Sequence, residues 1–307
     1  LGAAANSDEV NMVCCLTAKH LGAQYTIARI RNPEYEKQMR FMRSEMGLSM
    51  AINPEKVAAR AVAGMYEYCK IPYRTEGDLV HLGHAMAREG VALSVNMPVC
   101  TNPAKVRSCN EFAARIAATA HFASFGCLHP AMKGWREELR QFRSWGLIGL
   151  KIHNDYQEFF FDSQICQDMI EAAYEEGLMV LVHAGADPVS PGVTRCTPQM
   201  IAKAMPLLRQ GTFIAAHLGG HLLLDDAMKY VIGSEVYIDS SMAAMYYSDI
   251  RCRQAILAHD PDRVLFGSDS PWDDQAAAAQ IIHRMRLGDA LEKKVLWSNA
   301  ARLLQQA

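Results

Sequence analysis

The sequence lacks several features that would each indicate a particular class of protein. No apolar run in its 307 residues approaches the roughly 20 residues that a membrane-spanning helix needs. The nine cysteines are scattered without a Cys-x-x-Cys pair, which is typical of reduced thiols in the cytoplasm. The net charge is only −2, so no basic surface indicates nucleic acid or an anionic membrane as a partner. We therefore expect a cytoplasmic protein without membrane insertion, and we leave open whether it forms a homo-oligomer.

What the chain does contain is a regular alternation of strand and helix patterns after about residue 90. Helical segments at 103–120, 134–146, 163–177 and 197–211 separate short apolar runs, and several of these segments end in Gly. Seven apolar runs are typical of buried strands: 91–99, 121–130, 147–154, 178–185, 212–220, 235–241 and 263–272. This spacing predicts an α/β fold with a parallel sheet, one strand short of a (β/α)₈ TIM-type barrel.

Polar residues fall at the carboxyl ends of the predicted strands. Because the carboxyl ends of parallel strands meet at one mouth, we expect these side chains to converge on a site. A single strand-end histidine is more often a packing residue than a ligand, so the prediction rests on the whole set. Neutral imidazoles and a carboxylate are the ligands of catalytic Zn²⁺, which lowers the pKa of bound water toward about 7. The set consists of His129, Lys151, His153, His183, His217, Asp239 and Asp269.

Six motifs along the second part of the sequence resemble a known family. "GLKIH", "VLVHAGADP", "FIAAHLGG", "YIDSS", "RVLFGSDSPW" and "NAARLL" are similar to the metal-dependent amidohydrolase superfamily. The best resemblance is to its amidohydrolase-related (amidohydrolase 2) branch, which includes hydrolases and decarboxylases, and it covers about residues 55–307. It implies that His183, Asp269 and His217 bind metal, with His217 and Asp269 also catalytic in proton transfer. Lys151 lies where some two-metal members carry a carboxylated lysine, and here we expect it to polarise substrate or to support the structure.

The family's first strand ends in His-x-His, and no His-x-His occurs anywhere in this sequence. The histidines of "HLGH" (81–84) have the wrong spacing and lie in a segment with a helical period. At the corresponding position "SMAINP" (49–54) offers Ser49 and Ala51, neither of which suits a divalent metal. We therefore expect a divalent cofactor, zinc in the first place and manganese as the alternative, bound with lowered affinity.

The first fifty residues resemble a different family. Residues 6–55 are similar to part of the NAD-binding domain of the regulatory subunit of Trk-type potassium uptake systems. No strand leads into a G-x-G-x-x-G turn, so the sequence gives dinucleotide binding no physical basis. The patterns predict helices at 8–21 and 33–46 and strands at 25–31 and 48–52. We interpret the protein as a chimera of a partial Rossmann-like fragment (1–54) and an amidohydrolase-like barrel (55–307), with 48–52 replacing the first barrel strand.

These patterns predict a metal-dependent hydrolase or decarboxylase that acts on a small carboxylate or amide-like substrate through metal-activated water. Arg195 is suited to hold a carboxylate bidentately, although a solvated loop residue is the alternative. A catalytically dead barrel and an NAD-binding regulatory module of potassium transport remain as alternative functions. The residues that we expect to contact the small-molecule substrate are Asn96, His129, Lys151, His153 and Arg195.

Overall fold

A computed structural model describes residues 2–3, 8–23, 26–29, 50–52, 79–188, 190 and 192–306. The chain divides into two compact units, Leu1–Ile71 with Glu76–Asp78 and Pro72–Thr75 with Leu79–Ala307. The predicted boundary between residues 54 and 55 lies outside the described residues. Within the described part of the chain, no helix has the length and apolar character needed to cross a membrane.

The first unit contains a helix and a small parallel sheet. The helix α1 (Asp8–His20) confirms the predicted helix, and the predicted helix at 33–46 lies outside the described residues. The sheet has the order β1 (Gly2–Ala3), β2 (Ile27–Arg29) and β3 (Met50–Ile52).

The pairing of β3 corrects one prediction. β3 pairs in parallel with β2, with Ile27 opposite Met50 and Arg29 opposite Ile52. The prediction that residues 48–52 replace the first strand of the barrel is therefore wrong. A strand pairs readily with the strand that precedes it along the chain, and here that neighbour is β2 in the first unit.

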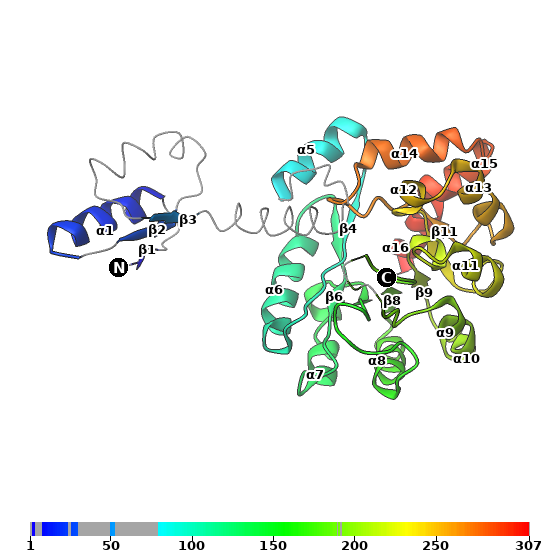
Figure 1. Cartoon of the computed structure of the whole chain (residues 1–307), viewed down its shortest axis with the longest axis horizontal. Coiled ribbons are helices and arrows are strands. Elements are labelled where there is room, and N and C mark those ends of the chain that lie inside the picture. Colours follow the sequence, from blue (N-terminus) through cyan, green and yellow to red (C-terminus); the bar gives the residue numbers. More distant parts are fainter. Residues whose placement is uncertain are drawn as a thin grey trace. The chain divides into compact units, whose positions relative to one another are not determined.

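The second unit is built on parallel strands (Figure 1). One group has the order β4-β5 and the other has the order β11-β10-β9-β8-β7-β6. Each of the seven predicted strand runs contains at least one of these strands, which confirms the α/β fold with a parallel sheet. The strands are β4 (Ser94–Asn96), β5 (Phe122–Ser124), β6 (Gly126–Cys127), β7 (Gly149–Ile152), β8 (Met179–Val182), β9 (Phe213–Ala215), β10 (Tyr237–Asp239) and β11 (Val264–Leu265).

The two strand groups are continuous through the predicted strand at 121–130. β5 pairs with β4 and β6 pairs with β7, and only Phe125 separates β5 from β6. The amide of Phe125 donates to the carbonyl of Asn96 at 3.0 Å, and that of Ile148 donates to the carbonyl of Ser124 at 3.0 Å. The order of strands from β4 to β11 therefore follows their order along the chain.

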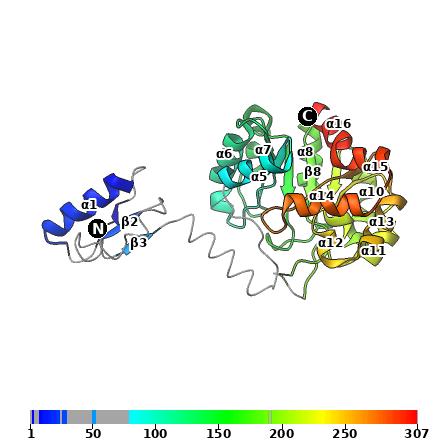
Figure 2. The ribbon, with the colours of Figure 1, turned by 90° about the horizontal axis from the view of Figure 1, so that it is seen from above.

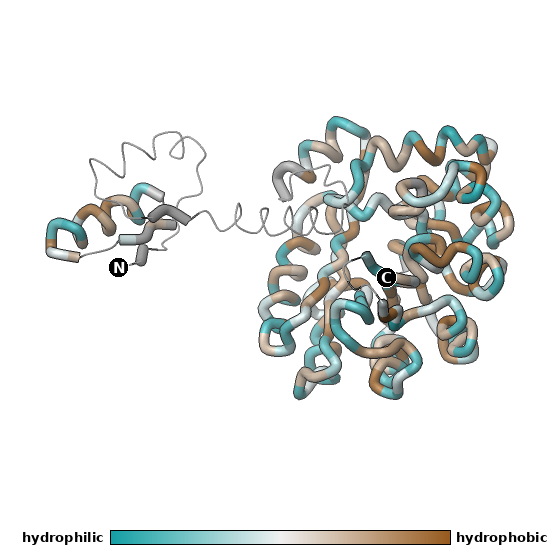
Figure 3. Tube along the Cα trace, in the orientation of Figure 1, coloured by the Kyte–Doolittle hydropathy of each residue, from teal (hydrophilic) through white to brown (hydrophobic). Residues whose placement is uncertain are grey.

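Helices lie on the outside of these strands (Figures 1 and 2). Helix α5 precedes β4, helix α14 follows β11, and the two helices pack against each other. Hydrophilic and hydrophobic stretches alternate along many of the helices, as expected for helices with one buried side (Figure 3). The helices are α5 (Leu79–Glu89), α6 (Val106–Ala117), α7 (Trp135–Arg140), α8 (Gln164–Glu175), α9 (Pro198–Lys203), α10 (Met205–Leu208), α11 (Leu224–Tyr230), α12 (Ala243–Tyr246), α13 (Asp249–Ala258), α14 (Gln275–Arg284), α15 (Asp289–Lys293) and α16 (Asn299–Gln306).

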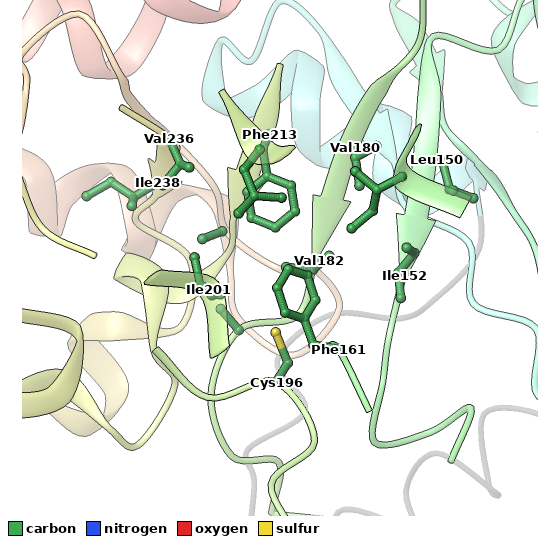
Figure 4. Packing of buried hydrophobic residues seen from close by; sticks show 14 of the residues in the cluster. Leu150, Ile152, Phe161, Val180, Val182, Cys196, Ile201, Phe213, Val236 and Ile238 are labelled. Carbon is green, nitrogen blue, oxygen red and sulfur yellow. The ribbon is translucent and has the colours of Figure 1, made fainter. Parts of the chain in front are cut away.

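Side chains alternate along the strands between two hydrophobic clusters. Successive strand residues point to opposite faces, so the two clusters lie on the two faces of the strand layer. Figure 4 shows part of the outer cluster, which packs against the helices. The outer cluster includes Leu150, Ile152, Val180, Val182, Phe213 and Ile238. The inner cluster consists of Phe125, Met179, Leu181, Ile214, Ala216, Leu265 and Leu303.

Candidate active site at the carboxyl ends of the strands

The strand register directs the predicted polar residues away from the outer cluster. In β7, Leu150 and Ile152 belong to the outer cluster, so Lys151 between them and His153 after them point to the inner face. In β8, Met179 and Leu181 belong to the inner cluster, and His183 continues the same alternation. Lys151, His153 and His183 are only 8%, 6% and 6% exposed. The inner face therefore changes from apolar to polar at the carboxyl ends of these strands.

Four histidines form one cluster at this end of the strands. The rings of His153 and His183 stack with centroids 4.2 Å apart and an angle of 15° between their planes. His217 Nε2 lies 3.0 Å from His183 Nδ1. The ring centroid of His221 lies 5.1 Å from that of His217 and 5.7 Å from that of His183. The prediction named three of these histidines and missed His221.

A backbone contact brings His221 to the cluster. The His221 amide donates to the Ala184 carbonyl at 2.7 Å, and the Ala186 amide donates to the His221 carbonyl at 2.9 Å. Gly185 between them has a φ of +97°, and a Cβ there would lie 2.2 Å from the His221 nitrogen. Only glycine fits at this close approach, because any side chain would meet backbone atoms. The "HAG" and "GGH" sequences are thus the signal from which His221 could have been found.

Asp239 and Ser241 hold His217 in place, and we call these three residues the triad. The Ser241 hydroxyl donates to Asp239 Oδ1, which also accepts the backbone amides of His217 and Ser241, each at 3.0 Å. His217 Nδ1 lies 2.8 Å from the hydroxyl oxygen of Ser241. A Cβ at Gly267, which lies just after β11, would be 3.0 Å from the Cβ of Ser241. The glycine therefore leaves space for the triad.

Burial controls the charge state of the cluster. Burial lowers the pKa of His183 well below the ordinary value, and the neighbouring His153 lowers it further. Burial also lowers the pKa of His153, and it lowers that of His221 to about 3. These imidazoles are therefore neutral at pH 7 and offer lone pairs to a cation. Burial lowers the pKa of Lys151, while the negative charges of Asp269 and Asp239 oppose this effect.

Asp187 is the main site residue that the sequence prediction missed. Its Oδ2 lies 3.6 Å from His153 Nε2 and 3.9 Å from His183 Nε2, and the side chain is only 8% exposed. One donor atom from each of these three residues lies within 4.8 Å of the others, which suits a bound metal ion. Asp187 lies in the quoted "HAGADP" motif, four residues after His183, in a loop that shows no strand or helix period.

The remaining predicted residues lie at different distances from this cluster. Asp269 is exposed, has a φ of +57°, and acts electrostatically on Lys151. Asn96 donates to the Ser124 hydroxyl at 2.8 Å, and its neighbours Val95 and Met97 pack against the inner cluster. The structure therefore does not bring Asn96 to the histidines.

Two further predicted substrate contacts have local partners. His129 is half-buried, and its Nδ1 accepts the Ala131 amide at 3.2 Å. Arg195 lies close to Asp155, with its backbone amide 2.8 Å and its Nη1 3.8 Å from Asp155 Oδ1. Asp155 is thus the ion-pair partner of Arg195, whose side chain is 20% exposed.

The residues present fit a divalent metal even though the sequence contains no His-x-His. Neutral imidazoles and a buried carboxylate are donors that divalent transition metals take in proteins. Within the group of His153, His183 and Asp187, His183 and Asp187 already offer both kinds of donor from the end of β8 and the loop after it. This loop supplies donors that do not depend on a first barrel strand.

Comparison with known families identifies the second unit. A family model described as amidohydrolase matches residues 70–306. The chain belongs to the amidohydrolase family. A model of the TrkA-N domain matches residues 1–54, which confirms the second resemblance seen in the sequence. A search of curated proteins found no match.

Solved structures with the same fold include decarboxylases and a hydrolase. The 5-carboxyvanillate decarboxylase from Sphingomonas paucimobilis is 15% identical, with a TM-score of 0.62 over 92% of this chain and 99% of that chain. A dihydroxybenzoic acid decarboxylase from Polaromonas sp. JS666, with bound manganese and 2-nitroresorcinol, is 18% identical (TM-score 0.60, 82% and 94% covered). A probable 2-pyrone-4,6-dicarboxylic acid hydrolase from Acinetobacter baumannii is 11% identical (0.55, 75% and 90%). At these identities the likeness shows the fold alone.

Proposed function

We propose that the second unit is a metal-dependent hydrolase or decarboxylase of a small carboxylic acid. The observation that carries the proposal is the cluster of buried, neutral imidazoles beside the buried amine of Lys151. Family membership and the decarboxylase and hydrolase neighbours support it. The proposed architecture is a (β/α)₈ barrel whose first strand is missing, next to a partial Rossmann-like segment. Zinc or manganese is the proposed metal, and a neighbour with bound manganese supports the second.

The metal would supply positive charge that polarises the substrate and lowers the pKa of water. Lys151, when protonated, offers a buried positive charge to a substrate carboxylate, and Asp239 and Asp269 stabilise that form. Arg195, which Asp155 holds in place, offers a second contact for a carboxylate at the mouth. Hydrolysis and decarboxylation both need such binding of an anionic substrate.

His217 and Asp269 are the proposed groups for proton transfer. The Asp239–Ser241–His217 triad places the Asp239 carboxylate where it stabilises positive charge on His217 through the Ser241 hydroxyl. His217 Nε2 lies 3.0 Å from His183 Nδ1, so a proton taken up in the cluster can be shared between these two rings. Asp269 is exposed at the end of β11, where it can exchange protons with water.

Turnover with and without metal tests the proposed function. We expect the full chain, loaded with Mn²⁺ or Zn²⁺, to release CO₂ from dihydroxybenzoates or 5-carboxyvanillate, or to hydrolyse 2-pyrone-4,6-dicarboxylate. A chelator should abolish turnover, and His217→Asn should lower kcat by at least about 100-fold. The exposed His84→Asn in α5 is the control, because His84 lies on a helix and outside the cluster. A chain that binds metal and converts none of a broad panel of carboxylic acids would indicate a catalytically dead barrel.

A further inference from the structure

We propose that His183 Nε2, the Asp187 carboxylate and the Ala186 carbonyl oxygen hold the divalent metal. This inference rests on the proposed function and replaces the predicted ligand set of His183, His217 and Asp269. All three donors come from the end of β8 and the loop after it. A metal held in this way needs neither the missing His-x-His nor Asp269.

The neighbours of His217 determine which of its ring nitrogens carries the hydrogen. His217 Nδ1 lies 2.8 Å from the hydroxyl and 3.3 Å from the carbonyl oxygen of Ser241. The hydroxyl proton of Ser241 is donated to Asp239, and a carbonyl oxygen only accepts, so Nδ1 of His217 must carry the hydrogen. In its neutral form His217 therefore has an unprotonated Nε2.

The unprotonated Nε2 of His217 in turn determines which ring nitrogen of His183 carries the hydrogen. Its Nδ1 lies 3.0 Å from His217 Nε2, so His183 Nδ1 must be the donor of that hydrogen bond. A neutral imidazole has one ring hydrogen, so His183 with its hydrogen on Nδ1 carries a lone pair on Nε2. Hydrogen bonding of one ring nitrogen commonly fixes the other as the metal ligand. The triad thus prepares His183 Nε2 for a cation.

Two oxygen atoms face His183 Nε2. The Ala186 carbonyl oxygen lies 3.4 Å and the Asp187 Oδ2 lies 3.9 Å from this nitrogen. All three atoms can donate an electron pair, so each is suited to bind a cation held near Nε2. Two atoms bonded to one ion at about 2.1 Å lie about 3 to 4 Å apart, and both measured distances from His183 Nε2 fall in this range. One imidazole with two oxygens favours Mn²⁺ more than a set of nitrogens would.

His153 belongs to the same cluster and has a different role. Its Nδ1 accepts the Tyr156 amide at 3.4 Å, so in the neutral ring the hydrogen is on Nε2 and points toward Asp187, whose Oδ2 is 3.6 Å away. Its plane is also nearly parallel to that of His183, so the two in-plane lone pairs cannot meet at one ion. His153 is therefore a positioning residue that orients the Asp187 carboxylate.

Binding of Mn²⁺ to the full chain tests the ligand set. Free Mn²⁺ is measured by electron paramagnetic resonance during titration of the wild type and of isosteric variants. We expect Asp187→Asn to raise the Kd for Mn²⁺ by at least about 100-fold and His153→Gln to raise it by about 10-fold. Glu138→Gln is the matched control, because Glu138 is also a buried carboxylate but bonds to Asn110 and Arg107, outside the cluster. We expect its Kd to stay within about 3-fold of the wild type.

Asp269→Asn separates this inference from the proposed function. We expect it to leave the Kd for Mn²⁺ within about 3-fold of the wild type while it lowers turnover. If Asp269→Asn abolishes binding and Asp187→Asn does not, the ligand inference is overturned and a metal-dependent function stands. If the wild type binds no Mn²⁺ or Zn²⁺, both proposals fail. Equal melting temperatures of the metal-free proteins show that each variant is folded.

Discussion

At the scale of single residues, Ser241 links the carboxylate of Asp239 to the imidazole of His217. It contributes one hydroxyl, which donates to Asp239 and lies 2.8 Å from His217 Nδ1. Because this hydroxyl has one proton to donate, its direction fixes the tautomers of His217 and His183 in turn. The state of the proposed metal ligand therefore depends on a residue that does not touch the metal.

Ser241→Ala tests this dependence. Without the hydroxyl, His217 keeps only the weaker contact of its Nδ1 with the carbonyl oxygen of residue 241, and the tautomer of His183 is no longer fixed. We expect the Kd for Mn²⁺ to rise by about 10-fold, as loss of a group behind a metal ligand commonly causes. Ser240→Ala is the control, because the Ser240 hydroxyl bonds to Gly267 and not to the triad. Equal Kd values for the two variants would show that the triad does not prepare the ligand.

Part of the site could be predicted from the sequence because strand ends are recognisable. Lys151 lies near the end of an apolar run, His183 and His217 each follow one, and the parallel topology brings the three together. Asp187 could not be predicted in this way, because it lies in a loop whose path depends on Gly185, and the only signal for His221 is the pair of glycine sequences "HAG" and "GGH". Loop residues carry no period, so nothing in the sequence places their side chains.

At the scale of elements, the positions of the strands could be predicted more completely than the pairing of one strand with another. A strand of a parallel sheet needs apolar side chains on both faces, so it gives a continuous apolar run in the sequence. Each of the predicted runs accordingly contains a strand. Pairing depends on which strand lies closest in space, and composition does not encode this. The segment around β3 shows the difference, since it forms a strand as predicted and pairs with β2.

Two glycine substitutions test the packing of elements with opposite expected signs. In β7, a Cβ at Gly149 would lie 2.3 Å from the Phe125 ring and 2.6 Å from the Met179 carbonyl oxygen. We expect Gly149→Ala to lower the free energy of unfolding by about 3 kcal/mol, because the inner cluster must shift. In α5, a Cβ at Gly83 would have no atom of the described residues within 4 Å apart from the helix's own backbone, so Gly83→Ala should raise stability by about 1 kcal/mol.

Urea unfolding followed by tryptophan fluorescence measures both effects. All four tryptophans lie in the second unit, at positions 135, 145, 272 and 297, so the signal reports this unit alone. A stable Gly149→Ala variant would contradict the packing of Phe125 against β7. A destabilised Gly83→Ala variant would contradict the open surroundings of Gly83 in α5.

At the scale of the whole molecule, buried neutral histidines couple stability to pH. Burial lowers the pKa of His259, which accepts the Gly233 amide at 3.0 Å and lies 2.9 Å from the Val236 carbonyl oxygen. A depressed pKa in the folded state means that the unfolded chain binds the proton first, near pH 6.5. Stability is therefore fully present above pH 6.5 and is lost as the pH falls below it. His153, His183 and His221 act in the same direction.

We expect the free energy of unfolding of the second unit to fall between pH 6.5 and pH 5. Each such histidine contributes at most about 1.4 kcal/mol per pH unit. His259→Asn keeps an acceptor for the Gly233 amide and removes one titrating group, so its stability should fall less steeply with pH. Urea titrations of both proteins at pH 7.5, 6.5 and 5.5 compare the slopes. Parallel slopes would contradict a neutral His259 in the folded protein.

The position of α16 has a consequence for the synthesis of the protein. Leu303 of α16 belongs to the inner cluster with Phe125 and Leu265, and Asn299 donates to the Val264 carbonyl at 2.8 Å. The first strands of the second unit are translated some 200 residues before this helix, since β4 begins at Ser94 and Leu303 lies far beyond it. The growing chain on the ribosome therefore cannot complete the inner cluster. Until α16 emerges, that apolar surface is open to chaperones and to aggregation.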